Sequence, residues 1–224
     1  MTPKSSRLAI VGDIHARRDA LAAVIDAIRD AGIERGVCTG DIVMRGPDPA
    51  ACIAVLRDLG WPVVVGNTDR KVIAGNPRPP EHPASSRVGS RSWTFRELER
   101  TDLEWLEALP GTVRLDLGGA RIVVTHGDAD SVSVPVNAAT SNRDLERLLR
   151  KLDADVLVVG HTHEAMIRTV RNGVVINPGA VGESRSADQQ PHWAWLEATA
   201  DGVTGHLEVI STPLAPQRDD TPED

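Results

Sequence analysis

The stretch LAIVGDIH, residues 8–15, runs from a short apolar segment directly into a carboxylate, Asp13, and an imidazole, His15. Four further segments end in a side chain that can bind a metal ion, most of them after an apolar run: Gly40-Asp41, Gly66-Asn67, His126-Gly127 and Gly160-His161-Thr162-His163. Such runs indicate buried parallel strands, whose carboxyl ends meet at one edge of an open α/β sheet. Seven ligand groups at one edge are more than a single ion needs, so the sequence predicts a centre for two metal ions.

The spacing and chemistry of these groups predict how they bind. Asp13 and His15 are two residues apart, as are His161 and His163, and in an extended segment such pairs leave the same face. Asp41 stands alone, and a lone carboxylate can bridge two ions. Mixed nitrogen and oxygen ligands disfavour Ca²⁺. We expect two divalent ions, with Mn²⁺ preferred and Fe, Zn²⁺, Ni²⁺ or Mg²⁺ as alternatives.

Composition bounds the class of protein. A chain of 224 residues with 41% hydrophobic residues can form one domain with a substantial core. The net charge of -7 argues against stable nucleic-acid binding. Cys38 and Cys52 fit no disulfide or metal pattern and are expected to be reduced core residues. With no signal-like amino-terminus and no apolar stretch near the roughly 18 residues of a membrane span, we expect a cytoplasmic protein that contacts no membrane.

The first third of the chain predicts a βαβαβ unit with parallel strands. Apolar residues at helical spacing predict a helix over about 19–31, and Asp48 is expected to cap a second helix that starts at Pro49. The strands around these helices are expected at Leu8–Gly12, Gly36–Thr39 and Pro62–Val65.

The rest of the chain predicts antiparallel strands with few helices. Two short helices are expected after a Pro- and Gly-rich loop at Gly75–Gly89, the second with a capping box from Thr101 to Glu104. One hairpin is expected around Leu117–Ala120 and another, of type I′, at Asn172-Gly173. We predict a single domain over residues 1–212, with a cap-like helical insertion at about 75–110 and a disordered acidic tail at 213–224.

The order DxH, GD, GN, H and GHxH resembles the calcineurin-like metallophosphoesterase superfamily, with markers from residue 7 to about 197. Residues 40–49, GDIVMRGPDP, resemble the branch related to diadenosine tetraphosphatases and serine/threonine protein phosphatases. Residues 177–182, NPGAVG, resemble the NPGSVG loop of small bacterial phosphodiesterases. The resemblance implies a four-layer α/β/β/α sandwich, with two mixed sheets flanked by helices.

The resemblance also implies roles for individual residues. One ion would be held by Asp13, His15, Asp41 and His163, and the other by Asp41, Asn67, His126 and His161. Arg45 matches an arginine that grips the substrate phosphate, and a guanidinium suits that task because it donates paired hydrogen bonds. Arg185, just past the NPGAVG loop, is a second candidate for substrate binding. Asp41, Arg45 and Asn67 are the expected catalytic residues.

The sequence departs from the family at the group that protonates the leaving oxygen. Many relatives continue the GN motif with His, whereas this chain has Thr68, and Met44 replaces the Asp that orients that His in protein phosphatases. A threonine hydroxyl is a poor general acid. We therefore expect substrates whose leaving group needs little protonation, unless another group donates the proton.

The predicted activity is a dinuclear metal-dependent phosphoesterase that hydrolyses phosphodiesters or activated phosphomonoesters by in-line attack of a metal-bridging hydroxide. The substrate would be a phosphorylated small molecule or a nucleotide. One alternative is a dinucleoside polyphosphate hydrolase or a serine/threonine phosphoprotein phosphatase. Another is a non-catalytic metal-binding scaffold, since the retromer subunit of eukaryotes resembles this fold. The sequence carries no prediction of the oligomeric state.

Overall fold

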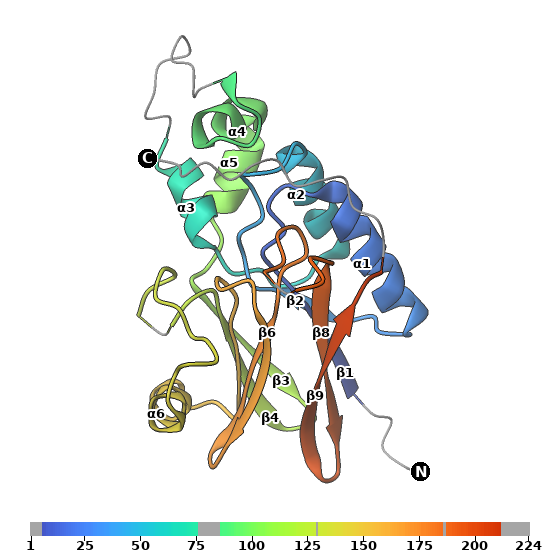
Figure 1. Ribbon diagram of the computed structural model, residues 1–224, viewed down its shortest axis with the longest axis vertical. Coiled ribbons are helices and arrows are strands. Elements are labelled where there is room, and N and C mark those ends of the chain that lie inside the picture. The colour runs from blue at the N-terminus through green and yellow to red at the C-terminus, as the bar shows by residue number, and fades with distance from the viewer. Residues whose placement is uncertain (1–5, 76–85, 129, 186, 212–224) are drawn as a thin grey trace.

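Two β-sheets lie face to face, with helices on their outer sides, in a computed structural model that describes residues 6–75, 86–128, 130–185 and 187–211 (Figure 1). The strands are β1 (Ser6–Val11), β2 (Gly36–Cys38), β3 (Thr112–Leu117), β4 (Ala120–Thr125), β5 (Val156–Val158), β6 (Ala165–Val170), β7 (Gly173–Pro178), β8 (His192–Thr199) and β9 (Gly202–Val209). The helices are α1 (Arg18–Asp30), α2 (Pro49–Leu59), α3 (Asn67–Ile73), α4 (Arg91–Glu97), α5 (Arg100–Glu107) and α6 (Asn142–Leu152).

Each sheet mixes parallel and antiparallel pairs. The four-stranded sheet has the order β2-β1-β8-β9, in which only β1 and β2 are parallel. The five-stranded sheet has the order β3-β4-β5-β7-β6, with β4, β5 and β7 parallel at its centre. β1, β2, β4 and β5 deliver their carboxyl ends to the loops that carry the candidate ligands.

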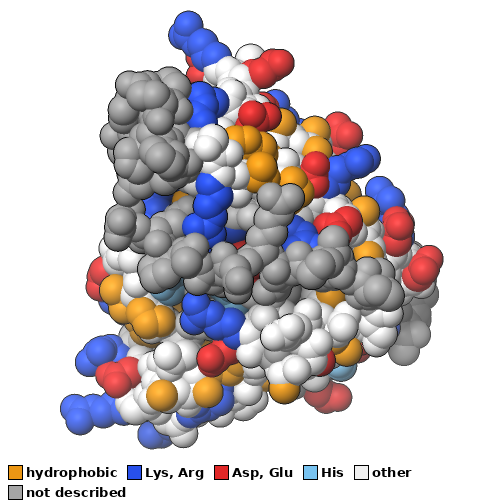
Figure 2. Space-filling model, turned by 45° about the horizontal axis from the view of Figure 1, so that its top comes forward, with side chains coloured by type: hydrophobic (Ala, Val, Ile, Leu, Met, Phe, Trp, Pro, Cys, Tyr) orange, Lys and Arg blue, Asp and Glu red, His pale blue; other side chains and the backbone are white. Residues whose placement is uncertain are grey.

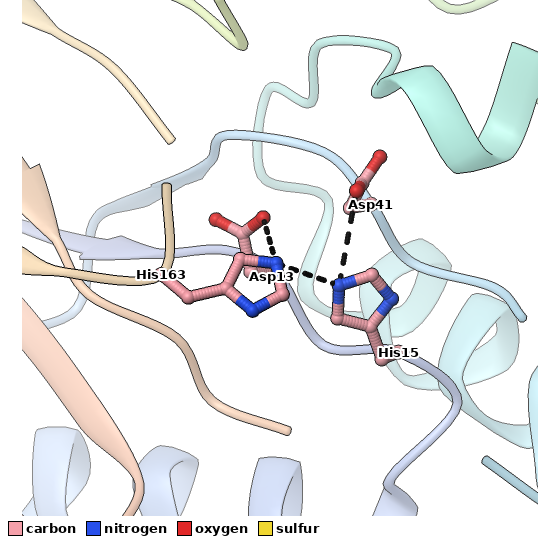
Figure 3. A group of neighbouring side chains, drawn as sticks. All are labelled: Asp13, His15, Asp41 and His163. Carbon is pink, nitrogen blue, oxygen red and sulfur yellow. Dashed lines mark hydrogen bonds and ion pairs between the residues drawn. The ribbon is translucent and has the colours of Figure 1, made fainter. Parts of the chain in front are cut away.

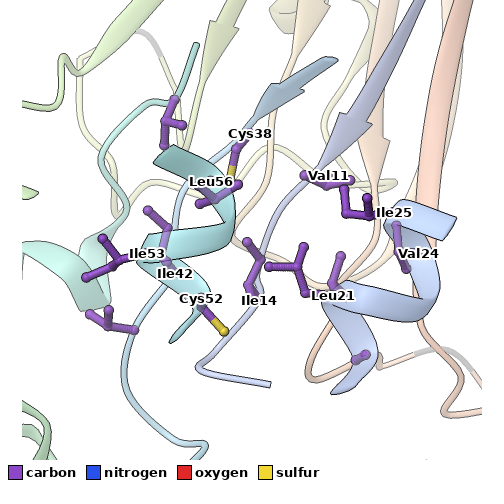
Figure 4. Packing of buried hydrophobic residues seen from close by; sticks show 14 of the residues in the cluster. Val11, Ile14, Leu21, Val24, Ile25, Cys38, Ile42, Cys52, Ile53 and Leu56 are labelled. Carbon is purple, nitrogen blue, oxygen red and sulfur yellow. The ribbon is translucent and has the colours of Figure 1, made fainter. Parts of the chain in front are cut away.

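Three apolar clusters separate the layers. Along β1, Ala9 and Val11 pack with the residues of α1 and α2, whereas Leu8 and Ile10 point to the other face and pack against the second sheet. This alternation is what a strand buried on both faces requires. Figure 4 shows the cluster under α1 and α2. α6 covers the outer face of the five-stranded sheet with its buried leucines, Leu145, Leu149 and Leu152. The four-layer α/β/β/α sandwich is confirmed.

The prediction of a third parallel strand at Pro62–Val65 is wrong. Only a single bridge forms, between Cys38 and Val63. The N–H of Val64 still donates to the carbonyl oxygen of Cys38 at 3.1 Å, but the N–H of Val65 donates to Pro110 at 2.9 Å instead. The chain therefore leaves the sheet as soon as it has paired, on its way to Asn67 at the start of α3.

Two local predictions are also corrected. The hairpin between β6 and β7 turns at Arg171 and Asn172, neither of which has a positive φ, so it is not of type I′. The capping box of α5 joins Glu99 to Asp102 rather than Thr101 to Glu104, because the helix begins at Arg100 and Thr101 already lies inside it.

Other predictions on the fold are confirmed or fall outside the described residues. Cys38 and Cys52 are buried free thiols, as expected. Asp48 precedes α2 as expected but makes no side-chain capping bond. In the part of the chain described, no helix combines the length and apolar character needed to cross a bilayer. The tail at 213–224 and most of the loop at 75–89 lie outside the described residues, and the cap-like insertion stays a prediction.

Candidate metal centre

The seven predicted ligand residues lie together where the two sheets meet the loops at their carboxyl ends. Asp13 and His15 follow β1, and Asp41 follows β2, both in the four-stranded sheet. His126 follows β4 in the five-stranded sheet. His161 and His163 follow β5 of the same sheet, and Asn67 is the first residue of α3. Both sheets therefore contribute to one site.

The backbone at these residues is left-handed rather than extended, so the expected extended geometry of the DxH and HxH pairs is wrong. Five ligand residues have positive φ: Asp13 (50°), His15 (48°), Asp41 (52°), His161 (71°) and His163 (62°). Each such residue costs roughly 1–2 kcal/mol in isolation. Main-chain bonds between loops offset this cost, with the N–H of Asp13 donating to Gly40 at 2.9 Å and that of His15 to Asp41 at 3.0 Å.

Glycines beside the ligands allow the loops to approach closely. A Cβ on Gly66 would lie 2.1 Å from Oδ1 of Asp41, and a Cβ on Gly160 would lie 2.9 Å from Oδ2 of Asp13. Side chains at these positions would displace the ligand carboxylates. The glycine that precedes the ligand in these motifs is therefore required by packing within the site.

The first group of donor atoms comes from Asp13, His15, Asp41 and His163, all buried (Figure 3). Their candidate ligand atoms lie within 4.8 Å of one another. Nε2 of His15 is 3.0 Å from Nε2 of His163 and 3.7 Å from Oδ2 of Asp41. Nε2 of His163 is 3.3 Å from Oδ1 of Asp13. Two imidazoles and two carboxylates thus converge on one point.

The second group of donor atoms surrounds Asn67. Its Oδ1 lies 2.9 Å from Nε2 of His126 and 2.7 Å from Nδ1 of His161. Nε2 of His126 also lies 3.3 Å from Oδ1 of Asp41. Asp41 therefore faces the second group with one oxygen and the first group with the other.

The close packing of these groups shifts their pKa values. Burial acts to raise the pKa of Asp41, but His126 and His15 outweigh it and hold that pKa below its ordinary value. Burial acts in the opposite sense on His126, yet Asp41 raises its pKa to about 9. Burial and the neighbouring His163 lower the pKa of His15. The carboxylate between the two groups is thus kept ionised.

The orientation of the imidazoles tests whether the residues fit metal ions. Nδ1 of His126 lies 2.8 Å from the carbonyl oxygen of Thr39, and Nδ1 of His163 lies 2.7 Å from that of Glu183. A carbonyl can only accept, so each Nδ1 carries a proton. The raised pKa values of both rings reflect a second proton at Nε2, and a cation that replaced this proton would meet the lone pair of Nε2. These lone pairs face carboxylate and amide oxygens. Acceptors directed at one another need a proton or a cation between them, so the donor set fits divalent ions.

Arg45 lies at the rim of the first group. Its Nη1 donates to Oε2 of Glu183 at 2.5 Å, and about a third of its side chain (33%) is exposed. The side chain of Arg185 is exposed, and its backbone N–H donates to the carbonyl oxygen of His163 at 3.3 Å. Figure 2 shows histidine atoms at the surface beside basic side chains, with acidic and basic residues interspersed over the face drawn.

Thr68 and Met44, which replace the acid pair of relatives, are buried. Oγ1 of Thr68 donates to the carbonyl oxygen of Val43 at 3.2 Å, and the residue is 1% exposed. The N–H of Thr68 donates to Oδ1 of Asp41 at 2.9 Å. Thr68 therefore helps to hold the Asp41 carboxylate through its backbone N–H. Its hydroxyl donates to a backbone carbonyl oxygen rather than into the site.

Two buried residues support the ligand loops in ways that the sequence reasoning did not fully identify. Asp69 caps α3 by accepting from the N–H of Gly66 at 2.9 Å. It also accepts from the N–H groups of Ile42 and Val43, which adjoin Asp41. Asn177 belongs to the NPGAVG loop, and its side chain donates to the loop that carries His161 and His163.

Comparisons with known proteins identify a family and similar structures. A family model described as a calcineurin-like phosphoesterase superfamily domain matches residues 7–201. A metallophosphoesterase from Sphaerobacter thermophilus is 28% identical, with a TM-score of 0.73 over 91% of this chain and 88% of that one. A hypothetical protein from Pyrococcus horikoshii has a TM-score of 0.75 over 91% of this chain and 87% of that one, and its 17% identity shows the fold alone.

An uncharacterized protein of Methanocaldococcus jannaschii is 26% identical over a match that covers 80% of this chain and 78% of the relative. The family match spans all five ligand-bearing loops and the strands from β1 to β8, and it ends just before β9. The resemblance read from the motifs is thereby confirmed. The chain belongs to the calcineurin-like phosphoesterase superfamily, a family of metal-dependent phosphoester hydrolases.

Proposed function

We propose that the chain is a dinuclear phosphoesterase. Asp13, His15, Asp41 and His163 would hold one divalent ion, and Asp41, Asn67, His126 and His161 would hold the other. The observation that carries the proposal is the place of Asp41, with Oδ1 3.3 Å from His126 and Oδ2 3.7 Å from His15. A carboxylate shared in this way suits a bridging ligand.

The residues of the chain hold and orient the reacting groups. When bound, a pair of divalent ions supplies Lewis acidity and activates a water near neutral pH. Thr39 and Glu183 fix the imidazoles of His126 and His163 through their carbonyl oxygens, so each ring offers Nε2. Arg45, at the rim, would bind non-bridging phosphoryl oxygens.

The leaving group is proposed to need little protonation. Thr68 donates its hydroxyl proton to the backbone, and neither it nor the thioether of Met44 can act as a general acid. Losing a positioned acid typically costs about 10²–10⁴ in rate for a poor leaving group. Phosphodiesters or activated phosphomonoesters are therefore the proposed substrates. The molecule that carries the ester would be a phosphorylated small molecule or a nucleotide.

A second candidate follows from the same observation. The leaving group in a dinucleoside polyphosphate is a nucleotide phosphate, which departs without an acid. Hydrolysis of this anhydride is thus the nearest rival, followed by phosphoprotein phosphatase activity. A non-catalytic scaffold is a weaker rival, because a protein-binding surface does not require seven buried or half-buried donors to converge.

The test compares turnover of a nitrophenyl phosphodiester, a nitrophenyl phosphomonoester and diadenosine tetraphosphate in the presence of Mn²⁺. We expect the diester to have the highest kcat/KM. Preference for the tetraphosphate would favour the anhydride hydrolase. Failure to hydrolyse any phosphoester with Mn²⁺ bound would favour the scaffold.

Asp41→Asn tests the shared carboxylate. Loss of one anionic ligand from both ions is expected to lower kcat/KM by more than 100-fold, since altering a residue that merely supports a ligand already costs about 10–100-fold. Asp26→Asn makes the same chemical change on the exposed face of α1 and should leave activity intact. Equal activity of both variants would exclude the proposed role of Asp41.

A further inference from the structure

The ion pair between Arg45 and Glu183 joins two loops at the rim of the metal centre. Nη1 of Arg45 lies 2.5 Å from Oε2 of Glu183. The side chain of Glu183 is 16% exposed and that of Arg45 is 33% exposed. The guanidinium proposed to bind phosphate is therefore already compensated by a carboxylate.

The backbone holds both partners in place. The N–H of Arg45 donates to Gly89 at 2.7 Å, and a Cβ on Gly89 would lie 2.3 Å from the carbonyl oxygen of Arg45. The N–H of Gly182 donates to the carbonyl oxygen of Asp13 at 2.9 Å. The carbonyl oxygen of Glu183 accepts from Nδ1 of His163. Arg45 is thus held by Gly89, and the loop of Glu183 is held by two ligand residues, Asp13 and His163.

Both charges act on the ligand imidazoles. Burial is the largest cause of the lowered pKa of His15, and the positive charge of Arg45 adds to it. Burial opposes the raised pKa of His163, which results from Asp13 with a further contribution from Glu183. Glu183 accepts from His163 through its carbonyl oxygen and pairs with Arg45 through its carboxylate, so both charges lie beside the proposed phosphoryl site.

We propose that Glu183 determines substrate specificity by favouring monoanionic phosphodiesters over dianionic phosphomonoesters. This inference rests on the proposed phosphoesterase function and deepens it. A phosphomonoester has a second pKa of about 6 and is a dianion above it, whereas a diester carries one negative charge. The Glu183 carboxylate repels the additional negative charge of the monoester. It also pairs with the Arg45 guanidinium, which would otherwise compensate that charge. The centre keeps enough positive charge for a monoanion.

The test measures kcat/KM for 4-nitrophenyl phosphate and bis(4-nitrophenyl) phosphate with Mn²⁺ at about pH 8, where the monoester is a dianion. The two substrates share a leaving group, so their ratio reports on charge rather than on protonation. Glu183→Gln keeps the size and the carbonyl oxygen of the residue. We expect it to raise the monoester-to-diester ratio roughly tenfold, the order of one charge interaction at a partly exposed site.

Glu197→Gln is the matched control. Glu197 also pairs with an arginine, Arg7, at 3.1 Å, and its side chain is similarly exposed at 22%. It lies on β8 and forms no part of the ligand loops. The control changes the net charge by the same amount and should leave the ratio as in the wild type. A ratio that stays constant in Glu183→Gln, even if both activities fall, would overturn the inference.

A binding measurement separates this inference from the proposed activity. Inorganic phosphate, mostly a dianion at this pH, and dimethyl phosphate, a monoanion, are titrated into the Mn²⁺-loaded protein by calorimetry. Glu183→Gln should tighten phosphate binding roughly tenfold more than it tightens dimethyl phosphate binding, because the repulsion grows with the charge of the anion. If the wild type hydrolyses neither ester but this shift occurs, only the activity is refuted. If hydrolysis occurs without the shift, only the role of Glu183 is refuted.

Discussion

Asn177 lies buried beside the loop that carries two of the imidazoles. Its Nδ2 donates to the carbonyl oxygen of Gly160 at 2.8 Å and to Oγ1 of Thr162 at 3.0 Å, while its Oδ1 accepts from the N–H of Gly179 at 2.9 Å. These bonds hold the loop in which His161 and His163 have positive φ. Asn177 therefore positions a ligand-bearing loop at Gly160, which lies 17 residues earlier in the sequence.

Asn177→Ala should lower the free energy of unfolding by about 3 kcal/mol, because it leaves buried partners unsatisfied. It should also weaken Mn²⁺ binding by about 10–100-fold, as expected for a residue that orients ligands. Urea denaturation and calorimetric titration measure these effects. Asn172→Ala, at an exposed turn, should change stability by less than about 0.5 kcal/mol. Unchanged Mn²⁺ affinity in Asn177→Ala would show that the loop holds its shape without this side chain.

Residue identities were predictable where chemistry alone selects them, but backbone conformation was not. The sequence order of carboxylates, amide and imidazoles predicted which residues would meet, and these seven do lie together. The left-handed φ of Asp13 and His15 was missed because the assumption of an extended chain ignores hydrogen bonds from the loop after β2. The roles of Asn177 and Glu183 depend on contacts between distant loops, which spacing does not encode.

At the scale of elements, α3 and the loop after β2 are joined by one carboxylate. Oδ1 of Asp69 accepts from the N–H groups of Ile42 at 2.9 Å and Val43 at 3.1 Å, and Oδ2 accepts from that of Gly66 at 2.9 Å. Burial, with a contribution from Asp41, raises the pKa of Asp69 to about 6. The residue fixes Asn67, on α3, relative to Asp41.

Asp69→Asn should destabilise the protein by about 2–3 kcal/mol, because an amide group would face backbone N–H donors that a carboxylate satisfies. Asp58→Asn, at an exposed position of α2, makes the same change outside these contacts and should have little effect. Urea denaturation with excess Mn²⁺ provides the comparison. Similar midpoints for the two variants would argue that α3 is held by packing alone.

The packing of α2 against β2 predicts inert thiols. Cys52 of α2 and Cys38 of β2 are fully buried in the cluster of Figure 4. Burial raises the pKa of both thiols, so the reactive thiolate is disfavoured. Neither cysteine should react with a disulfide reagent in the native protein, even when the pH is raised to about 9, near the ordinary thiol pKa. Both should react in denaturant, and a fast native reaction would indicate local opening at α2.

Element type was predicted well by periodicity, whereas element limits depend on tertiary partners. α1 begins and ends within one residue of the predicted helix, and α2 begins at Pro49 as predicted, because the buried faces of both repeat at helical spacing. The strand at Pro62–Val65 failed because the N–H of Val65 bonds to Pro110 rather than to β2. Such competition between partners is invisible in a local pattern.

At the scale of the whole molecule, the site exists only when the two sheets are stacked. Asp13, His15 and Asp41 come from one sheet, and His126, His161 and His163 come from the other. Divalent ions that bind these residues together must therefore favour the folded state over the unfolded chain. Ligand binding and the stacking of the sheets are linked.

Mn²⁺ at about 100 times its Kd should stabilise the fold by about 2.7 kcal/mol per site. For a chain of this size the melting temperature should rise by about 5–10 °C for one site. Thermal melts with Mn²⁺ and with a chelator measure the difference, and Asp41→Asn should lose most of it. A melting temperature that Mn²⁺ does not change would contradict a metal centre between the sheets.

The left-handed backbone at the ligand residues bears on how the ions enter. Main-chain bonds and close glycine contacts made by the chain itself set these angles, so the donor atoms need not be rearranged by the cation. Shedding of bound water by the entering ion then becomes the slow event, and Mg²⁺ gives up its water reluctantly. Which ion first fills the site in a newly synthesised molecule would consequently depend on the concentrations of the available ions and on how fast each exchanges its bound water, as much as on their intrinsic affinities.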